Sequence, residues 1–188
     1  MEALKTLDWM AREHAAIAAM LVRLERELGE LVRTGELDVE AFERLLAFFE
    51  QRVDGQHQEN EEREFLPRLT ARAAFQDSTL ARAVGAEHHA ERRLLETMRD
   101  HLEGATYGEP GSLATLALHA RRYAQRQRRH TEWETRLVFA LARRTLTAED
   151  DRAIVAGFRA LARARRGTVC GAARALARWL DRRHVPAA

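Results

Sequence analysis

Cysteine, proline and aromatic residues are all scarce in this sequence. Cys170 is the one cysteine among 188 residues, so no disulfide can form within the chain. No apolar run approaches the roughly 20 residues that cross a bilayer. The first residues, with Glu2 among them, lack the continuous apolar stretch of a secretory signal. Together these absences favour a cytoplasmic protein in a reducing compartment, with no membrane partner.

Helix-forming residues dominate the rest of the chain. Alanine, leucine, arginine and glutamate are abundant, only three prolines and ten glycines interrupt them, and hydrophobic residues make up 46% of the sequence. Apolar residues recur at helical spacing, and no segment alternates as a half-buried strand does. We therefore expect an all-α fold. It would be an up-down-up-down four-helix bundle over residues 1–146, with one or two additional C-terminal helices over 147–188 packed on the bundle.

Capping and helix-breaking residues set the expected helix ends. The first helix would run from about Leu7 to Val32 and end near Gly35, and Asp38 would cap a second that stops at Pro67. After a connection over 70–76, Asp77 or Ser78 would start a third helix that ends at Gly104. A loop over 104–111 would lead to a fourth, capped by Ser112 and reaching about Arg144. Thr147 with Asp150 resembles a capping box for a fifth helix, and Gly167 would divide it from a sixth that ends near Arg183.

Charge is distributed unevenly along the chain. Residues 152–188 hold nine arginines and one acid, Asp181, so this segment carries about +8 against about −6 for the preceding residues. We interpret it as a basic helical segment that lies on an acidic bundle. Binding to nucleic acid or to an anionic membrane is the alternative. No aromatic or glycine-rich recognition motif supports it, so no nucleic-acid partner is expected.

A duplicated pattern of histidines and acids lies within the predicted bundle. A Glu-His pair occurs in the first and third helices, and a His-x-x-x-Glu pair follows each of them. The residues are His14, His57 and Glu61 in the first half and His88, His130 and Glu134 in the second. The first and second histidines are 43 residues apart in one half and 42 in the other. Two hairpins of matched length would therefore bring six side chains to the same height.

Helical phase turns these side chains towards the core. A step of four residues leaves each His-x-x-x-Glu pair about 40° apart on one face. The histidines share their faces with Leu7, Met10, Leu21 and Leu28 (His14), Leu46 and Val53 (His57), Val84, Leu95 and Leu102 (His88), and Leu116, Leu137 and Leu141 (His130). A lone histidine on such a face is usually a hydrogen-bonded core residue. Two buried carboxylates are very unfavourable, however, and a bound cation is the simplest way to stabilise the whole set.

The ligand types narrow the choice of metal. A thiolate zinc site is excluded, because no cysteine belongs to the set. Imidazole nitrogen with carboxylate oxygen suits iron and also manganese or zinc. Each carboxylate can bridge two metals, which leaves coordination positions for a small ligand.

At these residues the chain resembles the hemerythrin-like, or HHE cation-binding, family, over about residues 7–145. Both Glu-His pairs and both His-x-x-x-Glu pairs carry the resemblance, with Glu-Glu-Arg-Glu-Phe-Leu-Pro from Glu61 and Glu-Thr-Arg-Leu-Val-Phe from Glu134. The resemblance implies two non-haem Fe ions, carboxylate- and oxo/hydroxo-bridged. Glu61 and Glu134 would be the bridges, and His14, His57, His88 and His130 the terminal ligands.

The sequence departs from the oxygen-carrying hemerythrins at two positions. Those proteins have a His-x-x-x-His pair on the third helix and an aspartate bridge on the fourth, whereas this chain has Arg92 and Glu134. One iron would therefore lack a histidine, which argues against reversible oxygen storage. The pattern is closer to family members linked to nitric oxide, peroxide or repair of iron centres.

Three functions remain open at this point. We expect a protein that binds or senses O2, NO or a related small oxidant, so its partner would be a small diatomic or peroxide ligand. The alternative is a di-iron enzyme or stress protein that acts on peroxide or nitric oxide, or donates iron for repair of iron centres. A third hypothesis is a metal-free bundle that works through its arginine-rich end.

The remaining candidate residues are sorted by phase and position. His89 is the main competitor of His88, while His101, His119 and His184 are read as surface or core histidines. Tyr123 lies two turns before His130 and could approach the metal or pack in the core. Trp133 and Phe139 are read as packing, and Cys170 as a buried bystander.

Overall fold

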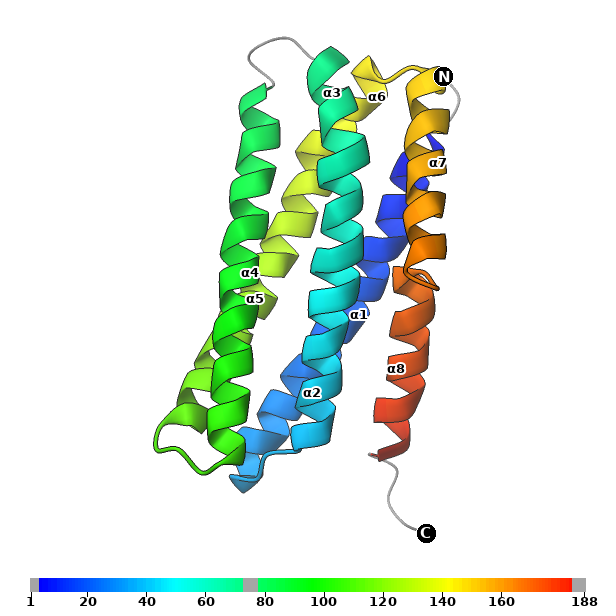
Figure 1. Cartoon of the computed structure of the whole chain (residues 1–188). Coiled ribbons are helices and arrows are strands. Elements are labelled where there is room, and N and C mark those ends of the chain that lie inside the picture. Colours follow the sequence, from blue (N-terminus) through cyan, green and yellow to red (C-terminus); the bar gives the residue numbers. More distant parts are fainter. Residues whose placement is uncertain (1–3, 73–77, 184–188) are drawn as a thin grey trace.

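Helices make up nearly all of the computed structural model, which describes residues 4–72 and 78–183 (Figure 1). Six helical rods follow one another in this part of the chain, and no strand occurs in it. The first rod is α1 (Lys5–Thr34), and the second joins α2 (Val39–Phe48), η1 (Phe49–Gln58), η2 (Glu61–Phe65) and α3 (Leu66–Arg72). The third is α4 (Ser78–Thr106), and the fourth joins α5 (Ser112–Trp133), η4 (Glu134–Val138) and α6 (Phe139–Thr145). The last two are α7 (Ala148–Ala164) and α8 (Val169–Arg183). The all-α prediction is confirmed.

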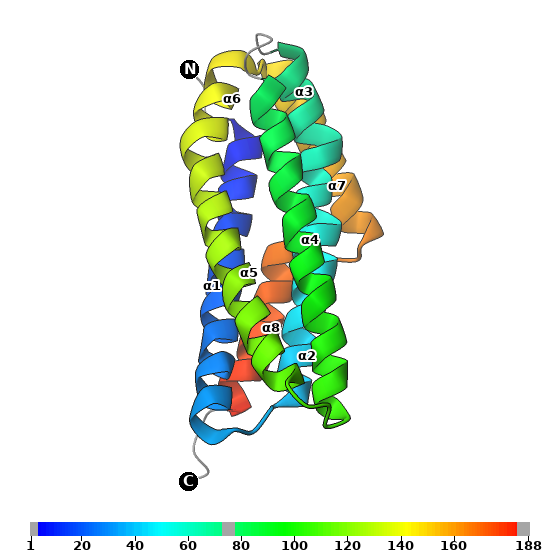
Figure 2. The same ribbon diagram turned by 90° about the vertical axis from the view of Figure 1, so that its left-hand side faces the viewer.

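The first four rods lie side by side along one direction (Figures 1 and 2). The link from α1 to α2 and the link from α4 to α5 lie at the same end of the molecule (Figure 2). Helix α4 packs closely along α5, and α1 contacts both α5 and α8. In the part of the chain that the structure describes, no helix is long and apolar enough to cross a membrane.

The second rod extends further than expected. Asp38 caps it as predicted, since its Oδ1 accepts a hydrogen bond of 3.1 Å from the Ala41 N–H. The predicted stop at Pro67 is wrong, because the helix continues to Arg72. Proline removes an N–H and crowds the carbonyl of residue i−4. The backbone hydrogen bonds already depart from the α-helical i to i−4 pattern before Pro67, because the Leu66 N–H bonds to the Glu61 carbonyl five residues back.

Wide π-helical turns occur at Phe49–Gln58, Glu61–Phe65 and Glu134–Val138. Such turns are rare and are frequently found at functional sites. They accommodate an extra residue, so side chains after them lose the 100° step of an α-helix. The expectation that Leu137 faces the core is wrong for this reason. Leu137 is 51% exposed, and its neighbour Val138 takes the buried position.

The link between α4 and α5 is shorter than the predicted loop. Helix α4 ends at Thr106 instead of Gly104, and Gly111 adopts a left-handed conformation with a φ of 82°. The prediction that Ser112 caps the next helix is wrong: Gly111 holds the cap position, and Ser112 is the first helical residue. Asp77 and most of the predicted connection over 70–76 lie outside the described residues, while 70–72 belong to α3.

The C-terminal helices begin and end close to the expected residues. The Thr147 hydroxyl accepts a bond of 3.2 Å from the Asp150 N–H, and the Asp150 carboxylate accepts one of 2.9 Å from the Thr147 N–H, which confirms the capping box. Gly167 lies between α7 and α8, as predicted. Both helices contact α1. The division at residue 146 into a bundle and an extension stays a prediction.

The basic segment is partly neutralised by acids of the second rod and its cap. Arg165 pairs with Glu59 at 2.8 Å, and Arg183 pairs with Asp38 at 2.6 Å and with Glu40 at 3.1 Å. These contacts agree with the interpretation of a basic segment that lies on acidic helices.

The apolar core is divided into two clusters. One contains Leu24, Phe42 and Phe49 among others, and the other contains Met10, Phe65 and Phe158. Along α1 the division falls between Met10 and Ile17, along the second rod between Val53 and Phe65, along α4 between Val84 and Leu95, and along the α5 to α6 rod between Ala124 and Val138. The six candidate ligands lie in these four gaps, so a polar layer separates two apolar ones.

Candidate metal centre

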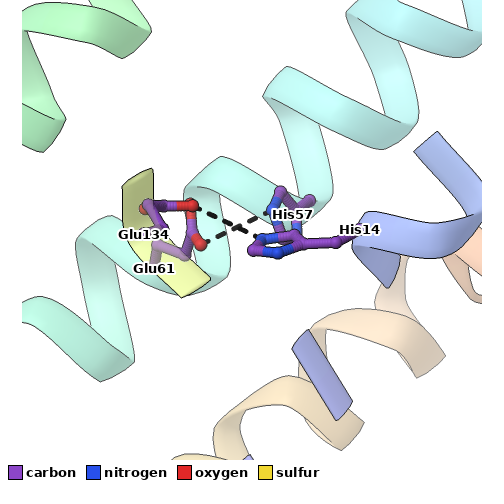
Figure 3. Close-up of side chains that lie close together, drawn as sticks. All are labelled: His14, His57, Glu61 and Glu134. Atoms are coloured by element: carbon purple, nitrogen blue, oxygen red, sulfur yellow. Dashed lines mark ion pairs between the residues drawn. The ribbon is translucent and has the colours of Figure 1, made fainter. Parts of the chain in front are cut away.

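Six buried side chains meet in the polar layer and form two overlapping groups. His14, His57, Glu61 and Glu134 make the first, and Glu61, His88, His130 and Glu134 make the second. Within each group the ligand atoms all lie within 4.8 Å of one another. Figure 3 shows the first group, in which histidines from α1 and the second rod face two glutamates. Both groups contain the same two carboxylates, and all six predicted residues are brought together.

Each histidine points its Nε2 atom at a carboxylate. His14 and His130 lie 3.4 and 3.5 Å from Glu134 Oε2. His57 lies 3.5 Å from Glu61 Oε1, and His88 lies 3.2 Å from Glu61 Oε2. Each carboxylate therefore lies between one histidine of the first group and one histidine of the second.

The inner atoms of this cluster are poorly satisfied by the protein itself. Among the described residues, both oxygens of Glu61, both oxygens of Glu134 and the Nε2 atoms of His14 and His57 have no hydrogen-bond partner. All six residues are at least 92% buried. Buried polar atoms normally have partners, and leaving a carboxylate without one is very unfavourable. Imidazole nitrogens and carboxylate oxygens are also the donors that first-row metal ions accept, so these residues fit a metal ion.

Three of the four histidines are held from outside through Nδ1. His57 Nδ1 lies 2.9 Å from Glu13 Oε2, and His88 Nδ1 lies 2.8 Å from Glu62 Oε1. His14 Nδ1 lies 3.2 Å from the Thr135 hydroxyl. An acceptor at Nδ1 leaves the lone pair on Nε2, which is the tautomer a metal requires.

The supporting acids have their own partners. Glu13 is 1% exposed and accepts a bond of 2.8 Å from the Trp9 indole. Glu62 accepts a bond of 2.7 Å from Arg92, which also pairs with Asp54. Arg92 therefore supports the ligand His88 from outside the centre, through Glu62. Sequence reasoning missed Glu13 and Glu62 in this role, although each is adjacent to a predicted ligand.

The carboxylates strongly perturb the histidines. Burial opposes protonation of His57, but Glu61 and Glu13 outweigh it and raise the pKa of His57 to about 9. In the same way burial is outweighed by Glu61 and Glu62, which raise the pKa of His88 to about 10. Burial raises the pKa of Glu61, but His57 and His88 more than offset this and hold it well below its ordinary value. Burial lowers the pKa of His130, and Glu134 and Glu61 only partly offset this.

A further buried carboxyl group lies three residues after His88. Glu91 is 1% exposed and accepts a bond of 2.6 Å from the Gln58 amide. The Gln127 amide nitrogen, in the orientation that satisfies its neighbours, lies 2.9 Å from the same carboxylate. Burial raises the pKa of Glu91 to about 8. Sequence reasoning missed this group, and its spacing of three from His88 was the available signal.

The other candidate residues lie away from the centre. His89 is exposed, and the rings of His101 and His119 stack on each other with centroids 6.4 Å apart. Tyr123 is buried in the core against Phe49, with ring centroids 5.0 Å apart.

Burial differs among the residues that were predicted not to bind the metal, Phe139, Trp133 and Cys170. Phe139 is buried and stacks on the His14 ring at 5.6 Å, and Trp133 packs on the core while partly buried. Cys170 is half-buried instead of buried, because it lies beside a groove between α1 and α8. His184 lies outside the described residues.

Fold and site together define an all-helical protein with buried histidine and glutamate groups close enough to hold a metal ion. Comparison with protein-family models, with curated proteins and with solved structures finds no match. Any family membership is therefore a proposal.

Proposed function

We propose that the chain is a hemerythrin-like protein whose two overlapping groups hold a pair of non-haem iron ions. The observation that carries this proposal is the sharing of Glu61 and Glu134 by both groups. Two ions side by side would share these carboxylates, because each acid lies beside one histidine of the first group and one of the second. The sequence resemblance to the HHE family supports the same ligand set.

In this proposal the protein is an up-down-up-down four-helix bundle. Helix α1, the α2 to α3 rod, α4 and the α5 to α6 rod would form it, and α7 and α8 would be the additional helices. A bundle core is a recurrent place for carboxylate-bridged metal pairs, because facing helices project ligands inward at one height. The division of the apolar core into two clusters supports this arrangement, since it leaves a polar layer for the ions.

The proposed activity is binding or sensing of O2, NO or a related small oxidant. A bound iron pair would supply Lewis-acid and one-electron redox chemistry towards such molecules. The protein would contribute two histidines and two shared glutamates to each ion, which leaves positions for a small ligand. Glu13, Glu62 and Thr135 would keep the histidines oriented, and the apolar clusters would restrict water around the site.

The enzymatic alternative has one observation in its favour. Reduction of peroxide or nitric oxide consumes protons, and Glu91 is a buried acid whose pKa of about 8 keeps it protonated at neutral pH. Gln58, which donates a hydrogen bond to Glu91, directly follows the ligand His57 in the sequence. Catalysis would need an electron donor as well, whereas binding needs none.

Stopped-flow absorption spectra of the reduced, iron-loaded protein mixed with O2, NO or H2O2 test the proposal. We expect a stable adduct with O2 or NO that forms once per iron pair. Repeated turnover of peroxide or NO with an added electron donor would favour the enzyme. No spectral change with any of the three would contradict both functions.

A further inference from the structure

A hollow of about 360 Å³ lies against His130 on the outer side of α4 and α5. It is lined by Ala83, Glu87, Arg126, Arg129, His130 and Trp133. His130 is only 2% exposed, and its Nε2 points inward to Glu134. The hollow therefore reaches the back of one candidate metal ligand.

His130 differs from the other three histidines at its outer nitrogen. His14, His57 and His88 each have an acceptor at Nδ1, whereas His130 Nδ1 is buried without a hydrogen-bond partner among the described residues. A neutral ring that uses Nε2 as a ligand atom carries its proton on Nδ1. When Nε2 is the ligand atom, an N–H donor that no described residue satisfies therefore lies beside the hollow.

Arginines line this hollow and a second one of about 470 Å³ that shares Arg126 and Arg129 with it. The second also contains Arg93 of α4 and Arg122 of α5. Arg122, Arg126 and Arg129 are spaced i, i+4 and i+7, so they follow one face of α5 over roughly 10 Å.

Few acids neutralise this row of arginines. Arg126 pairs with Glu87 at 2.9 Å, but Arg93, Arg122 and Arg129 are exposed and form no ion pair with a described residue. A guanidinium group presents several N–H donors in a plane that matches the oxygens of phosphate or carboxylate. Hollows of this size suit small molecules.

We propose that this α4–α5 groove binds a small phosphorylated molecule. Arg93, Arg122 and Arg129 would hold its phosphate oxygens, and its negative charge would lie beside the buried His130 ring. The groove needs no metal for this binding. If the proposed iron pair is present, the charge of the bound molecule would also act on the ligand His130.

Isothermal titration of inorganic triphosphate into the full-length protein, with and without metal, tests the proposal. We expect one site per chain in both forms, with affinity that falls as salt rises. Arg122→Gln and Arg129→Gln should each weaken binding by roughly 10- to 100-fold, as expected for a lost charge-assisted contact. Arg136→Gln is the matched control, because Arg136 is exposed on the same rod and outside both hollows. It should leave the affinity unchanged.

Nitrogen NMR of the histidine side chains in the metal-free protein adds an independent measurement. Triphosphate should shift the His130 Nδ1 signal and leave His14 unaffected. Equal weakening by all three arginine variants, or no shift at His130, would overturn the site. Binding of a single-stranded oligonucleotide without any binding of triphosphate would also overturn it, in favour of a nucleic-acid surface. These outcomes do not depend on iron, so they separate this proposal from the function of the centre.

Discussion

Glu134 belongs to both ligand groups, whereas His57 belongs to one, so removing them should have different effects. In His57→Ala the second group keeps all four of its ligands, and we expect metal content to fall from about two ions per chain to about one. In Glu134→Ala both groups lose a ligand, and we expect it to fall towards zero. His101→Ala is the control, because His101 stacks on His119 away from the centre.

The size of the accompanying change in stability follows from linkage. An ion present at 100 times its dissociation constant stabilises the folded chain by about 2.7 kcal/mol. In a chain of this length each kcal/mol shifts the melting temperature by about 2–4 °C. Each lost ion should therefore lower the melting temperature by roughly 5–10 °C relative to the loaded parent protein.

Elemental analysis after gel filtration, combined with calorimetry of metal-loaded and chelator-treated samples, measures both quantities. Chelation should remove most of the difference between parent and Glu134→Ala, because their remaining difference is packing alone. Equal losses of metal in His57→Ala and Glu134→Ala would refute the shared-carboxylate reasoning. Loss of metal in His101→Ala would refute the placement of the site.

Three further predictions concern neighbours of the centre. Glu13→Gln should weaken metal binding by about 10- to 100-fold in chelator competition, since it replaces the charged carboxylate acceptor of the ligand His57 with a neutral amide; unchanged affinity would contradict this. Glu91 keeps its proton in the folded chain up to pH about 8, against an ordinary value of 4.5, so stability should fall as pH rises between these values. Glu91→Gln should remove that dependence, worth roughly 5 kcal/mol at pH 9 in urea unfolding; an unchanged pH profile would contradict the burial argument. Leu141→Ala should cost about 2–5 kcal/mol and Leu137→Ala less than about 0.5, measured in the same way; the reverse order would rule out the π-turn at Glu134–Val138.

Helical periodicity and the duplicated motif predicted the helices and the six clustered residues from sequence alone. Spacings of 43 and 42 residues place His57 and His130 at the height of their partners because the two hairpins are nearly equal in length. Capping chemistry at Asp38 and at Thr147 with Asp150 is local, so it could be predicted without tertiary contacts.

Features that depend on contacts between distant segments could not be predicted in this way. The bond from His57 to Glu13 spans 44 residues, and no local pattern specifies it. The π-turns are also invisible to periodicity, because the arithmetic of phase assumes 3.6 residues per turn throughout. This assumption placed Leu137 in the core, whereas the expected end of the second helix at Pro67 came from the helix-breaking effect of proline. The assumption of 3.6 residues per turn did not mislead the choice of ligands, because each His-x-x-x-Glu pair remains on the inner face.

Iron stoichiometry together with a visible absorption spectrum of the purified chain tests the central claim most directly. The account predicts about two iron ions per chain and absorption from a carboxylate-bridged ferric pair, which disappears on reduction and chelation. Protein that takes up no iron under reducing, oxygen-free loading, or that saturates at one ion per chain, would contradict it.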